Sequence, residues 1–214
     1  MTALANALVL NIGTLQEDWL ESMILAAQKA NAKGIPVLLD PVGAGATRMR
    51  TEAARRIMAE CFVSVLRGNC SEILSLDSAD IRTRGVDSSM ALSDPTLEAI
   101  AEMAAARKCI IGVSGQVDCI TDGSHTYLVD NGHPLMGRVT GSGCGLSAVA
   151  AAFCAVAEGG LTEAAAAAFG FYGLCGDLAI KKSDKPGSFQ VAFMDALYSA
   201  GSREIEEHLS VRKL

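Results

Sequence analysis

The chain has 214 residues, enough for one α/β domain with a full core. Half of the residues are hydrophobic, 5% are aromatic and 20% are charged, which is typical of helices stacked on a buried sheet. The formal net charge is -6 and there are no basic runs, which argues against binding to nucleic acid or to an anionic membrane. A phosphate ligand would therefore be held by local backbone groups and a metal ion.

Cysteine usage indicates a reducing compartment. The seven cysteines are an odd number and no pair has C-x-x-C spacing, so neither a disulfide framework nor a zinc site is expected. Most lie in apolar runs and are expected to be reduced core residues. The first ten residues do not form a signal peptide, and no apolar run is long enough to cross a membrane. We therefore expect a cytoplasmic protein.

The first half of the chain predicts alternating strands and helices. Strands are expected at 7–12, 35–39, 62–66 and 109–113, with helices over 14–33, 48–60 and 96–107. A helix between consecutive strands favours a parallel sheet, with ligands at the carboxyl ends of the strands. Residues 77–93 are polar and are expected to form an exposed excursion.

The second half predicts a hairpin followed by helices. The expected strands are 117–121 and 125–129, on either side of an Asp-Gly turn. The expected helices are 146–158, 162–182 and 188–208, which makes the C-terminal part mainly helical. No linker or repeat divides the chain, so we expect a single domain over 1–214.

A glycine-rich segment is the strongest candidate site. Glycines stand at 141, 143 and 145, and a long apolar run over 146–157 follows with the composition of a buried helix. A glycine turn that leads into a helix gathers unpaired N–H groups at the positive end of the helix dipole, which favours a phosphate. Cys144 lies inside this segment. The alternative is a plain loop-to-helix turn with a small buried thiol.

Polar residues follow three of the predicted strands. Asp40 begins a loop with two glycines, and Arg67 and Glu72 follow the third strand. Carboxylates are suitable ligands for Mg²⁺, and arginine pairs with phosphate through two N–H groups. The alternatives are helix caps for the two acids and a surface ion pair for Arg67. Asp118 follows the fourth strand and could simply be a hairpin residue.

Taken together, the motifs resemble one known family. They lie at 11–15, 40–47, 67–73, 114–118, 131–134, 139–144 and 186–189. This set, in this order over nearly the whole chain, resembles the hydroxyethylthiazole kinases. The resemblance implies a ribokinase-like fold of three layers, α/β/α, with a mostly parallel central sheet. It also implies transfer of the γ-phosphoryl group of ATP to the hydroxyl of 4-methyl-5-(2-hydroxyethyl)thiazole in thiamine salvage, with Mg²⁺, by homotrimers with active sites between subunits.

The resemblance also implies roles for individual residues. The metal and phosphate region would contain Asp40 and Glu72. The ATP contacts would be Arg67, Ser114 and Asp118, and the thiazole contacts would be Asn11, Gly13 and Gly141. The catalytic anion hole would be formed by Gly141, Ser142, Gly143 and Cys144, with Cys144 where related sugar kinases have an aspartate.

Some positions differ from the family pattern. The family usually has threonine where Ser114 and Ser142 stand, and often glycine where Lys185 stands. It also has an N-terminal segment before the first strand, which supplies a strand, a helix and thiazole contacts. We expect this chain to lack that segment, as a truncated product, a form with a late start site or a degenerate copy. Two alternatives remain: a non-catalytic remnant that binds nucleotide or assembles with full-length subunits, and another ribokinase-like kinase, such as a pyrimidine-alcohol kinase. The cysteine in the anion hole argues against the second.

Overall fold

The protein is described by a computed structural model that covers residues 1–77 and 93–214. Within these residues, one sheet has seven strands whose spatial order equals their order in the chain. They are β1 (Leu8–Asn11), β2 (Val37–Asp40), β3 (Val65–Asn69), β4 (Ile110–Ser114), β5 (Asp118–Thr121), β6 (Thr126–Val129) and β7 (Val211–Lys213). The pairs from β1 to β4 are parallel and those from β4 to β7 are antiparallel. The expected mostly parallel centre is therefore confirmed for the first four strands.

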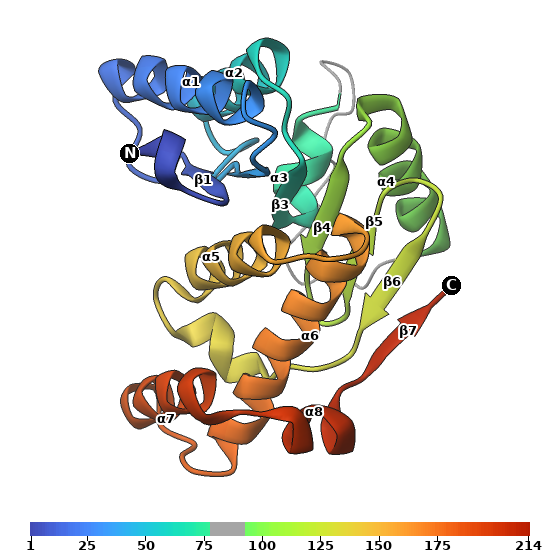
Figure 1. Cartoon of the computed structure of the whole chain (residues 1–214). Helices are drawn as coiled ribbons and strands as arrows, with labels where there is room; N and C mark the ends of the chain where they lie inside the picture. The colour runs from blue at the N-terminus through green and yellow to red at the C-terminus, as the bar shows by residue number, and fades with distance from the viewer. Residues whose placement is uncertain (78–92) are drawn as a thin grey trace.

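Helices cover both faces of the sheet (Figure 1). One face carries α1 (Glu17–Asn31), α2 (Arg48–Glu60), α3 (Cys70–Ser75) and α4 (Asp94–Arg107). The other carries α5 (Ser142–Ala155), α6 (Leu161–Ile180) and α7 (Pro186–Ser199), and α8 (Ser202–His208) follows them. Short 3₁₀ helices lie at η1 (Thr2–Leu4) and η2 (Pro134–Arg138). This is the expected three-layer α/β/α arrangement.

Two hydrophobic cores lie on opposite faces of the sheet. Leu39 packs into the core with α1, α2 and α4, and its neighbour Leu38 packs into the core with α5, α6 and α7. Successive side chains of a strand point to opposite faces, so a strand buried on both sides needs a continuous apolar run. That requirement explains the apolar run at 35–39. The single-domain organisation stays a prediction, and it is supported by the one sheet that both cores share.

The predicted elements differ from the structure at the third strand and at the C-terminus. The strand expected at 62–66 begins only at Val65 and runs through Arg67 to Asn69, because Phe62 is exposed and its N–H is bonded by the Asn31 side chain. The prediction of one helix over 188–208 is wrong. The helix α7 ends at Ser199, Ala200 is extended, and α8 and then β7 follow.

The first helix also differs from its predicted bounds of 14–33. It begins only at Glu17, after Gln16, which makes no side-chain cap bond. Trp19 is 54% exposed, whereas Ala27 and Ala30 on the same helix are buried. Of the expected excursion at 77–93, residues 78–92 lie outside the described residues.

The cysteines agree with a reduced interior. All seven lie in the described ranges and none forms a disulfide; six are buried and Cys144 is exposed. Burial raises the pKa of the Cys119 and Cys175 thiols to about 12. Across residues 1–77 and 93–214, no helix is both long and apolar enough for a membrane span.

Candidate active site

The predicted site residues gather where the parallel strands end. Asn11 pairs with Asp40 in the β1–β2 register, and Asn69 pairs with Ser114 in the β3–β4 register, so these strand ends share one edge of the sheet. The N-terminus of α5 meets the same edge through direct contacts with Asn11, Asp40 and Arg67. Of the predicted residues, Arg67 lies within β3 rather than in the loop after it.

Asp40 is a buried carboxylate at the centre of this edge, with 1% of its surface exposed. Its Oδ2 accepts hydrogen bonds from the Ser147 hydroxyl at 2.7 Å and from the Asn11 side-chain amide at 2.9 Å. Nη1 of Arg67 lies 3.7 Å from the same oxygen. Burial raises the pKa of the Asp40 carboxyl, and the Arg67 charge and the Ser147 hydrogen bond oppose that rise. The negative charge of Asp40 thus depends on these partners.

Arg67 connects β3, β4 and α5. Its Nη1 donates to the Gly143 carbonyl at 3.0 Å and its Nη2 donates to the Ser114 hydroxyl at 2.8 Å. Only 7% of the residue is exposed, and its Nε has no hydrogen-bond partner among the described residues. A buried unpaired donor is unusual, because its desolvation is not compensated. The guanidinium is therefore rigidly held and retains one unused donor.

The start of α5 presents free backbone N–H groups. Gly141 is its N-cap with φ +86°, a left-handed conformation that favours glycine. Gly145 donates its N–H to the Gly141 carbonyl at 2.8 Å, whereas those of Gly143 and Cys144 have no acceptor in the described part of the chain. The Ser142 carbonyl, at the same turn, accepts from the Tyr172 hydroxyl at 2.7 Å. Two aligned N–H groups at a helix N-terminus suit an anion.

Asn11 links Cys144 to Asp40. Its side-chain nitrogen donates to Sγ of Cys144 at 3.3 Å as well as to Asp40. Its Oδ1 accepts the Gly13 N–H at 2.9 Å, which determines which end of the amide faces the thiol. The exposed thiol and the buried carboxylate are therefore bridged by one amide group.

Glu72 has a structural role in addition to any ligand role. Its carboxylate accepts the N–H groups of Asn69 and Gly43, each at 2.9 Å, and the Asn69 side chain accepts the Glu72 N–H. This is a capping box for α3, as the alternative interpretation of Glu72 expected, and it also ties the loop after β2 to α3. Each carboxylate oxygen retains a second lone pair, so the group still suits a cation.

Metal binding at this edge would involve few protein ligands. Among the described residues, no three His, Cys, Asp or Glu side chains cluster as a complete metal site. Mg²⁺ usually binds through one or two carboxylates, with water and substrate phosphates as its other ligands. The buried Asp40 and the nearby Glu72, whose charges interact, fit that pattern.

Asp118 lies at the start of β5, next to the Ser114 end of β4. Its Oδ1 accepts the Gly115 N–H at 2.8 Å. Burial raises the pKa of the Asp118 carboxyl to about 7, against the opposing effects of that hydrogen bond and of the Arg67 charge. The hairpin interpretation of Asp118 is correct for its position at the start of β5, and its carboxyl still interacts with the Arg67 charge.

The raised pKa of Asp118 predicts a pH-dependent stability. Between pH 3.8 and about 7 the folded chain keeps this proton and the unfolded chain loses it, so the group's contribution to stability falls as pH rises across that range. Asp118→Asn removes this titration and retains an acceptor for Gly115. We expect the variant's stability advantage to grow from pH ~4 to pH ~7 and then level off, reaching roughly 1 kcal/mol once solvent screening is allowed for. Urea unfolding of both proteins across this pH range measures it, and a constant difference would contradict it.

Three residues in these contacts were not predicted. Ser147 lies one helical turn after Gly143, and a buried serine in an apolar helix was the signal available for it. Tyr172 is a lone tyrosine in the alanine-rich helix α6, and its hydroxyl occupies the space where a Cβ of Gly145 would lie. Arg50 on α2 donates to the Gly13 carbonyl at 3.1 Å, and only the charge pattern of its helix was visible in the sequence.

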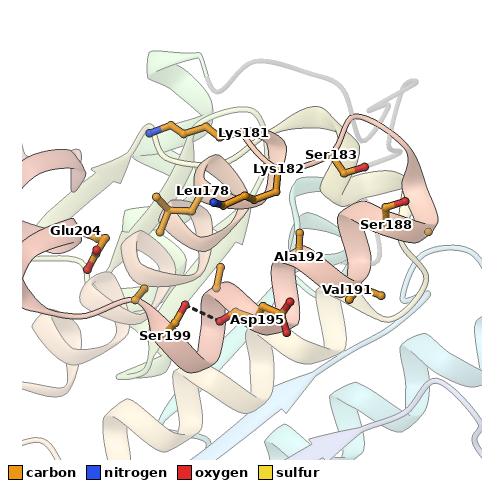
Figure 2. A pocket seen from close by; sticks show the side chains of 13 residues that line it. Leu178, Lys181, Lys182, Ser183, Ser188, Val191, Ala192, Asp195, Ser199 and Glu204 are labelled. Carbon is orange, nitrogen blue, oxygen red and sulfur yellow. Dashed lines mark hydrogen bonds between the residues drawn. The ribbon is translucent and has the colours of Figure 1, made fainter.

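A separate pocket of about 1090 Å³ lies between the end of α6, α7 and α8. Figure 2 shows Leu178, Lys182, Ala192 and Asp195 around it. It is lined by none of the predicted site residues. The candidate site therefore lies at the strand ends, where its hydrogen bonds and free N–H donors define it, and not in this pocket.

Comparison with known proteins points to one family. The model of the hydroxyethylthiazole kinase family matches residues 1–202. The hydroxyethylthiazole kinase of Desulfotalea psychrophila is 48% identical over 213 residues, which cover 100% of this chain and 77% of that protein. The structure of the hydroxyethylthiazole kinase protein from Pyrococcus horikoshii superposes with a TM-score of 0.88 at 36% identity, over 100% of this chain and 79% of that one.

A more distant structure supports the fold. A possible 1-phosphofructokinase from Thermotoga maritima has a TM-score of 0.56 at 14% identity, over 100% of this chain and 58% of that one, and so shares the fold alone. The ribokinase-like fold expected from the sequence is thereby confirmed. With a family model over nearly the whole chain and relatives this similar, the chain belongs to the hydroxyethylthiazole kinase family.

Proposed function

We propose that this chain transfers the γ-phosphoryl group of ATP to the hydroxyl of 4-methyl-5-(2-hydroxyethyl)thiazole, a reaction of thiamine salvage. The observation that carries the proposal is the start of α5, where two free N–H groups lie beside an exposed thiol, a buried carboxylate and a buried guanidinium. Phosphoryl transfer requires positioning and charge neutralisation more than a strong base. These groups supply both at one place.

The phosphoryl group would be held at the helix start. The N–H groups of Gly143 and Cys144 donate to its oxygens, and the left-handed Gly141 and the following Ser142 keep the turn open around them. Arg67 neutralises the phosphate chain of ATP. Ser114, which bonds Arg67, and Asp118, whose carboxyl feels the Arg67 charge, shape the nucleotide side.

Asp40 and Glu72 would hold Mg²⁺, directly or through water. When bound, the ion supplies positive charge that offsets the negative charge of the phosphates. The hydrogen bonds from Ser147 and Asn11 orient the Asp40 carboxylate toward this position. The capping-box bonds of Glu72 orient its carboxylate in the same way.

The thiazole alcohol would bind against Asn11, Gly13 and Gly141, with its hydroxyl next to Cys144. A primary alcohol is far less acidic than a thiol, so Cys144 does not remove its proton before attack. The sulfur either accepts the proton late in the reaction or orients the hydroxyl. Asn11 holds the sulfur in place for both roles.

We also propose that the chain assembles as a homotrimer. Its support is an apolar row on the outward side of α7. Val191, Met194 and Tyr198 are 63%, 61% and 94% exposed. Residues three and seven positions apart lie on one face of a helix, and an exposed apolar face favours contact with another subunit.

The test of the proposed function is ADP release from MgATP with and without the thiazole alcohol. We expect thiazole-dependent release by the wild type, a decrease of roughly 10- to 100-fold in Cys144→Ala, and retained or raised activity in Cys144→Asp, because a carboxylate also accepts a proton. Cys61→Ala is the control, since Cys61 lies at the opposite end of the sheet, before β3 begins.

Each outcome separates the alternatives. An alanine variant with unchanged kcat would exclude the proton-acceptor role of Cys144. Turnover of a hydroxymethyl pyrimidine in place of the thiazole would favour the other kinase activity. A folded wild type that binds ATP and never releases ADP would contradict the proposal and favour a non-catalytic protein.

A further inference from the structure

Arg50 contacts two of the loops that form the candidate site. It is the third residue of α2, and its N–H is capped by the Thr47 side chain at 3.3 Å. Its Nη2 donates to the Gly13 carbonyl, in the loop after β1. Its guanidinium also lies directly on Gly43, in the loop after β2, where an added Cβ would collide with Nη1. Gly43 has φ +75°, a conformation that favours glycine. Arg50 therefore packs the two loops together.

The contact with Gly13 leads directly to the thiol. The N–H of Gly13 donates to Oδ1 of Asn11, and this bond turns the Asn11 nitrogen toward Cys144 and Asp40. If Gly13 moved, the hydrogen bond that orients the Asn11 amide would be lost. The amide oxygen could then turn toward the Asp40 carboxylate. Two oxygens facing each other without a proton repel. The orientation of Asn11 thus depends on where Arg50 holds Gly13.

The contact with Gly43 leads to the second carboxylate. Glu72 accepts the Gly43 N–H at 2.9 Å, so this residue is held by Glu72 through its nitrogen and covered by Arg50 at its Cα. A planar guanidinium can lie flat on a glycine while one of its nitrogens donates elsewhere, whereas a lysine ammonium is a single point. The geometry therefore requires arginine rather than any cation.

Two other arginines of α2 differ from Arg50 in their partners. Arg48 pairs with Glu52, and Arg56 pairs with Glu21 and Glu60, all at the surface. For Arg50, the described residues include no carboxylate within ion-pair distance, and its bond goes to a backbone carbonyl at the site. Its position on the helix is thus not explained by a surface ion pair.

We propose that Arg50 is a positioning residue for the acceptor side of phosphoryl transfer. It does not touch the reacting atoms. It fixes Gly13, Gly13 fixes the Asn11 amide, and the Asn11 amide fixes the Cys144 sulfur beside the alcohol. The role assigned to Arg50 rests on the proposed function, and it makes the thiazole side more sensitive to this residue than the ATP side, which Arg50 reaches only through the contact of Gly43 with Glu72.

The experiment compares Arg50→Met, Arg50→Lys and the control Arg48→Met. In steady-state kinetics we expect Arg50→Met to lower kcat/KM for the thiazole alcohol about 10- to 30-fold, because small displacements of positioned groups are costly to rate. The KM for ATP should stay within about twofold. Arg50→Lys should restore only part of the loss, and Arg48→Met should match the wild type.

A second readout does not need turnover. Cys144 is the exposed cysteine of the seven, so iodoacetamide should label it first, as peptide mass spectrometry would show. The Asn11 amide holds the Cys144 sulfur in one position, and the rate of alkylation depends on how the sulfur is presented to the reagent. We therefore expect alkylation of Cys144 at fixed pH to change severalfold in Arg50→Met and to stay unchanged in Arg48→Met.

The two readouts distinguish failure of the proposed function from failure of the role assigned to Arg50. If the wild type does not phosphorylate the thiazole, the proposed function is wrong, and the alkylation rates alone decide the role of Arg50. A folded Arg50→Met protein that is alkylated at the wild-type rate, or whose KM for ATP rises as much as that for the thiazole alcohol, would overturn the positioning role. If Arg50→Met does not fold, Arg50→Lys is judged by the same two criteria.

Discussion

Arg67→Met is expected to lower the free energy of unfolding by about 3 kcal/mol, because it leaves a buried carboxylate without its nearest positive charge. The methionine fills much of the same space, but the Gly143 carbonyl and the Ser114 hydroxyl lose their donors. The Asp40 pKa should then rise further, since the Arg67 charge is the largest effect that opposes its burial. Thiazole-dependent ADP release should fall by at least about 10³-fold, because the same guanidinium is proposed to neutralise the phosphates.

A double-mutant cycle separates the charge effect from lost packing. If the unpaired charge of Asp40 causes the loss of stability, adding Asp40→Asn to Arg67→Met should recover about 1–2 kcal/mol of the free energy of unfolding, because residues in contact are energetically coupled. Urea unfolding of the four proteins near neutral pH measures the coupling. The exposed Arg48→Met is the matched control and should change stability by less than about 0.5 kcal/mol. Equal losses in Arg67→Met and Arg48→Met would show that the buried pair contributes nothing.

Asp40→Asn is expected to lower kcat about 10³-fold while changing the free energy of unfolding by less than about 1 kcal/mol. The asparagine oxygen can still accept from Ser147 and Asn11, so the local hydrogen bonds survive. Removal of a buried charge favours folding, and loss of the Arg67 partner opposes it. The two effects approximately cancel, but the variant cannot supply a negative ligand to the metal.

Kinetics at several Mg²⁺ concentrations, together with urea unfolding, check this prediction. Asp195→Asn on α7 is the control, since Asp195 is an exposed aspartate outside the strand-end site. It should leave kcat unchanged. A value of kcat for Asp40→Asn within about tenfold of the wild type, with the same dependence on Mg²⁺, would exclude Asp40 as a metal ligand.

The fold was predictable where burial leaves a pattern in the chain. A strand buried on both faces must be apolar at every position, as Leu38 and Leu39 are, and this requirement reveals β2. β7 carries no such pattern, because Arg212 and Lys213 are exposed and only pairing with β6 makes the segment a strand. The division of the last helix depends on the extended Ala200, for which a helical composition gives no warning.

The candidate site was predictable where chemistry stands out locally. Asp40, Arg67 and Cys144 are polar or reactive residues at the ends of apolar runs or within a glycine turn. Ser147 and Arg50 were missed because their contacts join distant parts of the chain. Ser147 reaches Asp40 across 107 positions and Arg50 reaches Gly13 across 37. Such contacts exist only after the helices pack, so a local pattern such as a serine in an apolar helix can mark the residue but cannot identify its partner.

The strand order has a consequence for how the protein forms. Because each strand lies next to the one made just before it, the sheet can grow strand by strand as the ribosome releases the chain. The candidate site at the strand ends cannot form in the same gradual way. Asp40 emerges 27 residues before Arg67 and 107 residues before Ser147, so its carboxylate stays hydrated until α5 has left the exit tunnel. The kinase site is thus completed in one late step, when α5 closes over a sheet that is already mostly built.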